Sequence, residues 1–70
     1  MALTQMEKHL VLGLKLFGLT EEDQAAIFLV LQKEEQQVAL MEYMAKNLNA
    51  DGSELLRETL RILDDTENTL

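Results

Sequence analysis

Hydrophobic residues recur along this chain every three or four positions, which is the spacing of one face of an α-helix. The first such stripe contains five residues: Leu3, Met6, Leu10, Leu14 and Phe17. At its start, Thr4 and Glu7 have the spacing of a capping box, in which each side chain bonds the backbone N–H of the other residue. At its end, Gly18 is suited to the left-handed turn that terminates many helices. This pattern predicts a first helix over about residues 4–17.

The most apolar stretch of the chain runs from Ala25 to Leu31 without a polar residue. Thr20 is a favourable N-cap before it, and the acids at 21–23 suit the positive end of a helix dipole. A buried β-strand is the alternative, because Ile-Phe-Leu-Val-Leu has high β propensity. The helix-forming flanks favour a second helix over 21–31. Because a helix that is apolar all round must be covered on every side, we expect this helix at the centre of the fold.

Six polar residues follow at 32–37 and separate this stretch from the next apolar stripe. A helix continuing unbroken would place Glu34 or Glu35 on its apolar side, so a break near Gln32 and Lys33 is expected. No Ser, Thr, Asp or Asn is present there as a cap, and one continuous helix therefore remains the alternative. The third helix is predicted over 34–48.

The segment from Asn47 to Ser53 is polar and predicts a loop, with Asp51 or Ser53 capping a last helix over 53–65. That helix is strongly amphipathic, and residues 66–70 are expected to fray. The chain contains no proline, no internal repeat and no domain boundary. The sequence thus predicts a single all-α domain over 1–70, a compact bundle of four short helices at about 4–17, 21–31, 34–48 and 53–65.

A chain of 70 residues buries a small core, and such domains usually gain stability from disulfides, metals or oligomerisation. Cysteine is absent and His9 is the only histidine, so oligomerisation is the support that remains available. The first helix also carries more leucines than one core-facing stripe needs. We expect a homodimer formed mainly through the first two helices, with an interface that contains Val11, Leu12, Leu16, Phe28 and Tyr43.

Thirteen acidic residues against six basic ones give a net charge of −7. This charge disfavours direct binding to nucleic acid and to anionic membranes, and no apolar run is long enough to span a bilayer. The N-terminal residues do not resemble a secretory signal, so a cytoplasmic location is expected. The expected partners are therefore a second copy of the chain, another protein, or both.

The residues available for catalysis are few. His9 has no cysteine to activate, and Ser53 is the only serine and lies far from it in the sequence. A chain this short also offers little concave surface. We expect no enzymatic activity and no cofactor.

One loop matches part of a metal-binding motif. Residues 47–58 resemble the EF-hand calcium loop, with glycine at the sixth position and these candidate ligands: Asn47, Asn49, Asp51, Ser53 and Glu58. Asn47 stands where the family has aspartate, and Glu54 stands where the family has an apolar residue. Calcium binding through this loop is one alternative function. A second alternative is an acidic nucleic-acid mimic that occupies the basic surface of a DNA-binding protein.

Two runs of sequence carry a family resemblance: Gly-Leu-Thr-Glu-Glu-Asp-Gln-Ala-Ala-Ile and Glu-Glu-Gln-Gln-Val-Ala-Leu-Met-Glu-Tyr-Met, within residues 18–48. They resemble small uncharacterised helical proteins of Gram-positive bacteria and their mobile elements. The resemblance implies a compact helical fold and no known activity. The leading expectation is an acidic all-α protein-interaction module that homodimerises and has a regulatory role.

Overall fold

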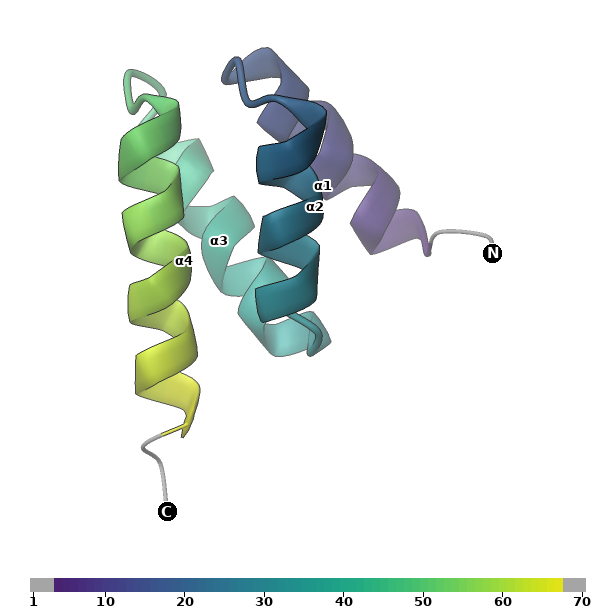
Figure 1. The fold of residues 1–70 in the computed structure, drawn as a ribbon, viewed down its shortest axis with the longest axis vertical. Helices are drawn as coiled ribbons and strands as arrows, with labels where there is room; N and C mark the ends of the chain where they lie inside the picture. The colour runs from purple at the N-terminus through teal and green to yellow at the C-terminus, as the bar shows by residue number, and fades with distance from the viewer. Residues whose placement is uncertain (1–3, 68–70) are drawn as a thin grey trace.

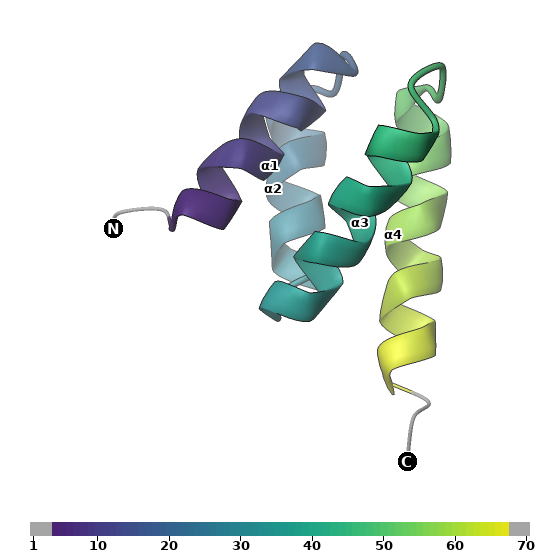
Figure 2. The same cartoon turned by 180° about the vertical axis from the view of Figure 1, so that it is seen from behind.

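The computed structural model describes residues 4–67, which form four helices and no strand. They are α1 (Gln5–Leu16), α2 (Glu21–Val30), α3 (Glu34–Lys46) and α4 (Gly52–Glu67). Figure 1 shows α2 and α4 side by side on one face, and Figure 2 shows α1 and α3 on the opposite face. The closest helix pairs are α1 with α3, α3 with α4, and α2 with α4. The predicted all-α four-helix bundle is confirmed.

The ends of α1 and α2 form as the sequence predicts. The Thr4 hydroxyl accepts from the Glu7 N–H at 3.1 Å, and the Thr4 N–H donates to the Glu7 carboxylate at 2.9 Å. Gly18 ends the turn after α1 with a φ of 84°, where a residue with a Cβ would be strained. The Thr20 hydroxyl caps α2 by accepting from the Asp23 N–H at 3.1 Å.

The predicted break between α2 and α3 is present, and two buried glutamines stabilise it. Gln37 Nε2 donates to the Leu31 carbonyl at 2.9 Å, and Gln36 Oε1 accepts from the Lys33 N–H at 3.1 Å. These bonds satisfy backbone groups that a helix end would otherwise leave without a partner. The polar run at 32–37 is therefore only partly a surface segment.

The core is aliphatic and draws on all four helices and the α1–α2 turn. Its buried hydrophobic residues are Leu10, Leu14, Leu19, Ile27, Leu31, Leu40, Met44, Leu55 and Ile62. The tip of Met44 on α3 fills the space beside Gly13 on α1, since a Cβ built on Gly13 would lie 2.7 Å from Met44 Cε. From the expected stripe of α1, Leu10 and Leu14 reach this core, whereas Leu3 lies outside the described residues.

The expectation that α2 is enclosed on every side is wrong for the single chain. Ala25 and Ala26 are exposed, and the side chain of Leu29 is 73% exposed. Within residues 24–31, only Gln24, Ile27 and Leu31 are buried. A run of apolar residues does not itself indicate which side faces the core, and here the outer side faces solvent.

The ends of α3 and α4 also differ from the prediction. Helix α3 ends at Lys46, so Leu48 lies beyond it and is exposed. Helix α4 continues through Glu67, because the Thr66 hydroxyl accepts from Gln36 Nε2 at 2.8 Å and is held against α3. The predicted fraying of 66–70 is therefore wrong for Thr66 and Glu67, and residues 68–70 lie outside the described part of the chain.

Candidate protein interface

Leu12 and Leu16 on α1 form the exposed part of the predicted interface. They are 58% and 87% exposed and lie one helical turn apart, so they are neighbours on the same face. Val11 beside them is half-buried. Phe28 and Tyr43 instead pack against the core from α2 and α3, and Tyr43 lines the groove between α3 and α4. The five predicted residues therefore do not form one continuous surface.

A second apolar surface, which the sequence did not reveal, lies between α2 and α4. It contains a hollow of about 140 Å³ whose walls present no polar atoms, lined by Ala26, Ile27, Val30, Leu56, Thr59 and Leu60. The Thr59 hydroxyl donates to the Leu55 carbonyl of its own helix at 2.8 Å. This hydroxyl therefore needs no hydrogen bond from a bound molecule. We call this surface the α2–α4 groove.

Two exposed leucines border the α2–α4 groove. Leu60 belongs to its wall and is 60% exposed. Leu29 follows Ala26 by three residues on α2 and therefore lies beside the hollow on the helix surface. One apolar strip on each helix could have been predicted, because four residues separate Ala26 from Val30 and Leu56 from Leu60. Their pairing depends on the packing of α2 on α4, which the sequence alone does not specify.

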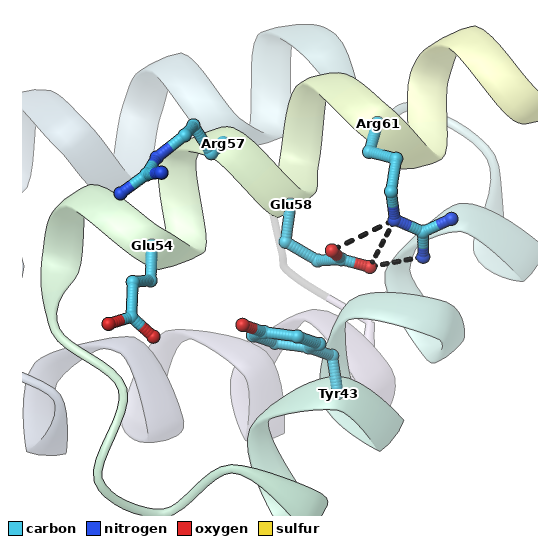
Figure 3. Close-up of a pocket in the computed structure, with 5 residues that line it drawn as sticks. All are labelled: Tyr43, Glu54, Arg57, Glu58 and Arg61. Carbon is cyan, nitrogen blue, oxygen red and sulfur yellow. Dashed lines mark hydrogen bonds and ion pairs between the residues drawn. The ribbon is translucent and has the colours of Figure 1, made fainter.

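The groove between α3 and α4 is polar and wider. Its hollow of about 510 Å³ is lined by Tyr43, Glu54, Arg57, Glu58 and Arg61. Figure 3 shows Glu54 and Glu58 extending from α4 on the side of Tyr43, with Arg57 pointing the other way. This arrangement brings two carboxylates and one aromatic ring to the same side of α4.

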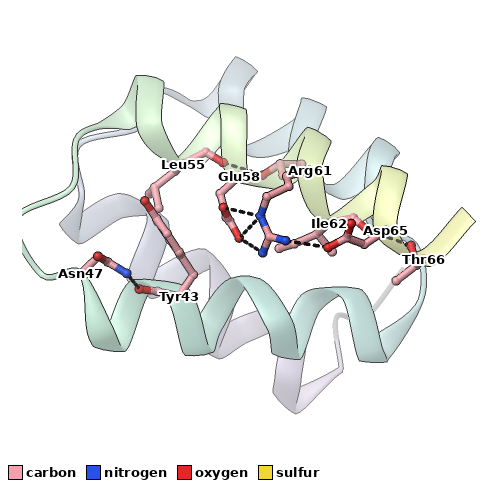
Figure 4. Close-up of polar contacts among 9 residues, drawn as sticks. Tyr43, Asn47, Leu55, Glu58, Arg61, Ile62, Asp65 and Thr66 are labelled. Atoms are coloured by element: carbon pink, nitrogen blue, oxygen red, sulfur yellow. Dashed lines mark hydrogen bonds and ion pairs between the residues drawn. The ribbon is translucent and has the colours of Figure 1, made fainter. Parts of the chain in front are cut away.

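Two charged groups of that groove, Glu58 and Arg61, are engaged with each other. Arg61 Nε donates to both carboxylate oxygens of Glu58 at 2.9 Å, and Arg61 Nη1 donates to Asp65 at 2.6 Å (Figure 4). The hydrogen bonds and charge of Glu58, with a smaller effect of Asp65, raise the pKa of Arg61 above its usual value. Because arginine stays charged at every accessible pH, this shift produces no pH dependence of stability. The network holds α4 side chains in place.

Three of the five candidate calcium ligands, Asn47, Asp51 and Glu58, have other partners in the structure. Asn47 Nδ2 donates to the Tyr43 carbonyl at 2.9 Å, and Asp51 Oδ1 accepts from the Glu54 N–H at 2.9 Å as the cap of α4. Glu58 is bound to Arg61, while Asn49 and Ser53 are exposed. Within residues 4–67, no three His, Cys, Asp or Glu side chains are arranged to hold a metal ion. Calcium binding by loop 47–58 stays a prediction.

The two residues considered for catalysis lie on the surface of different helices. His9 is exposed on α1, and Ser53 is exposed in the first turn of α4. No helix in the described part of the chain is long and apolar enough to cross a membrane. The surfaces that could bind a partner are thus the exposed leucine pair on α1, the apolar α2–α4 groove and the polar α3–α4 groove.

Comparison with protein-family models, with curated proteins and with solved structures found no match to this chain.

Proposed function

We propose that this chain is a small acidic protein-interaction module that receives the side of a partner helix in the α2–α4 groove. The observation that supports this function is the hollow between Ala26, Val30, Leu56 and Leu60, which is open to solvent and lined by apolar atoms alone. Exposed apolar surface of this kind costs solubility, and in soluble proteins it commonly marks a site of association.

The size of the hollow suits a single anchoring side chain. An apolar cavity of about 150 Å³ is sufficient to bind benzene. The hollow of about 140 Å³ therefore has room for one leucine or phenylalanine from a partner. Interfaces between a helix and a groove typically depend on such anchors, surrounded by contacts that exclude water. Leu29 and Leu60 supply these surrounding contacts on the two sides of the hollow.

Self-association through α1 is the second part of the proposal. Leu12 and Leu16 lie one turn apart on the outer face of α1, separate from the α2–α4 groove. Helix α1 carries Lys8 and Lys15 against the single acid Glu7, so it is the helix on which two acidic chains repel each other least. A dimer built on α1 leaves the groove available for a different protein.

Two neighbouring alanines on α2 provide the test. Ala26→Leu fills the hollow from its own wall, whereas Ala25→Leu adds the same side chain about 100° away around the helix. Immobilised wild-type chain and both variants are exposed to lysate of the source organism, and bound proteins are identified by mass spectrometry. We expect wild type and Ala25→Leu to retain the same partner and Ala26→Leu to lose it.

Circular dichroism and urea unfolding check that both variants remain folded, which is expected because both alanines are exposed. A partner retained equally by the Ala26→Leu variant would contradict binding in the groove.

A further inference from the structure

We infer that the occupant of the α2–α4 groove is a cationic amphipathic helix, with one large apolar anchor and lysine or arginine on either side of it. This inference rests on the proposed function and specifies the chemistry of the partner. It follows from where the acidic residues stand relative to the apolar hollow.

Carboxylates lie at both ends of the groove. Helices α2 and α4 run in the same direction, as the colours in Figure 1 show, so the start of α2 and the end of α4 lie at opposite ends of the groove. The first turn of α2 contains Glu21, Glu22 and Asp23. The last two turns of α4 contain Asp64 and Glu67, about one and two turns after Leu60, whereas Asp65 is bound to Arg61 on the side of α3. The apolar centre is therefore bounded by negative charge along the groove axis.

The direction of the two helices adds to this charge at their C-terminal end, whereas at the other end the positive ends of both helix dipoles partly offset Glu21, Glu22 and Asp23. Both α2 and α4 place their C-terminal carbonyl groups at the same end of the groove, and neither has a basic residue in its last turn. The negative ends of two helix dipoles therefore add to the acids of α4. Lys33, after α2, and Arg57, one turn before Leu60, are the basic residues beside the groove. Five acids against these two leave the surroundings negative.

A second copy of the chain fits this charge pattern poorly. A two-fold interface sets the same patch of both chains against itself. Because both ends of the groove are acidic, either antiparallel or parallel alignment of two copies would bring carboxylates against carboxylates. Like charges across an interface oppose association, and each chain carries a net charge of −7. A partner helix with cationic flanks would instead set positive groups against the carboxylates at the groove ends, and its charge would be opposite to that of the chain.

Three synthetic helical peptides test the inference. They share one length and one apolar face with a central phenylalanine, and their flanking residues are lysine, glutamine or glutamate. Binding of each fluorescein-labelled peptide to the full chain is measured by fluorescence anisotropy. We expect the lysine peptide to bind about tenfold more tightly than the glutamine peptide, and the glutamate peptide to bind most weakly. The difference between lysine and glutamine should shrink when NaCl rises from about 0.05 M to about 0.5 M.

The two alanine variants separate groove binding from general attraction to an acidic protein. Ala26→Leu should lose binding of the lysine and glutamine peptides, and Ala25→Leu should bind both as wild type does. Backbone NMR shifts caused by the lysine peptide should centre on Ala26, Val30, Leu56 and Leu60.

Each other outcome has a defined meaning. Equal affinity for the lysine and glutamine peptides, lost in Ala26→Leu, would retain the groove as a binding site and overturn its preference for a cation. Lysine-peptide binding that persists in Ala26→Leu would overturn the inference and is what a charge-based nucleic-acid mimic predicts. Self-association that disappears in Ala26→Leu would make a second copy the occupant. Failure of all three peptides to bind would contradict both the inference and the proposed function.

Discussion

At the scale of single residues, buried glutamine amides bond the backbone of the turns between helices. Gln24 Nε2 donates to the Leu19 carbonyl at 3.1 Å, and Gln37 Nε2 donates to the Leu31 carbonyl at 2.9 Å. Gln36 joins two helices, since its amide accepts from Lys33 and donates to Thr66. An amide can do this because it both donates and accepts. The chain thus satisfies its turn carbonyls with side chains that come from inside the bundle.

The Gln37 amide should contribute measurably to stability. Gln37→Met keeps the approximate side-chain length but removes the donor, which leaves the Leu31 carbonyl buried without this bond. We expect the free energy of unfolding to fall by about 1–3 kcal/mol, measured by urea denaturation.

Gln32→Met is the matched control, because Gln32 Nε2 bonds the Leu29 carbonyl at 3.1 Å in an exposed position where water can replace it. Its effect should stay within about 0.5 kcal/mol. Equal losses in both variants would show that burial of the amide is not what matters.

At the scale of helices, local signals predicted the starts of the helices well, the ends of α3 and α4 less well, and packing poorly. Thr4, Gly18 and Thr20 were correctly interpreted because caps and left-handed turns depend on neighbouring residues alone. The break after Leu31 was predicted from periodicity, but the buried glutamines that stabilise it were not. Within a polar run, a pattern cannot distinguish exposed Gln32 from buried Gln37. The α2–α4 groove was missed for a related reason, since it depends on which helices become neighbours.

Two glycines in the α1 region should respond to alanine in opposite directions. In Gly13→Ala the new Cβ meets Met44 Cε, the end of a flexible side chain that can move aside, and α1 gains up to about 1 kcal/mol from better helix propensity. In Gly18→Ala no atom obstructs the Cβ, but the φ of 84° costs on the order of 1 kcal/mol. Urea midpoints should therefore rise for the first variant and fall for the second. A fall of similar size in both would show that Met44 cannot yield.

At the scale of the whole molecule, an acidic chain exposes two separate apolar surfaces. The leucine pair on α1 lies beside Lys8 and Lys15, whereas the α2–α4 groove ends in carboxylates. The sequence predicted an apolar surplus on α1 and exposed Leu12 and Leu16 agree with it. Phe28 and Tyr43 of the predicted interface instead pack against the core, because their positions relative to α1 are set by tertiary packing, and the interface itself stays a prediction.

The dimer proposal can be tested by removing the leucine pair. Sedimentation equilibrium at high micromolar concentration should give a dimer for wild type and a monomer for the double variant Leu12→Ser, Leu16→Ser. Leu48→Ser is the control, because Leu48 is equally apolar and exposed but lies between α3 and α4. A monomeric wild type would refute self-association, and a dimer that survives the double variant would place the interface elsewhere.

The order in which the helices pair also determines whether the chain can be divided. Because α1 packs on α3 and α2 packs on α4, the close partners of the first two helices both lie beyond Gln32. A fragment ending there would contain two short helices without their main contacts, and isolated helices of this length are marginal in water. The N-terminal half therefore does not constitute a folding unit. Cleavage at the α2–α3 turn would release an unfolded N-terminal fragment, which regains structure only when the C-terminal fragment is present to complement it.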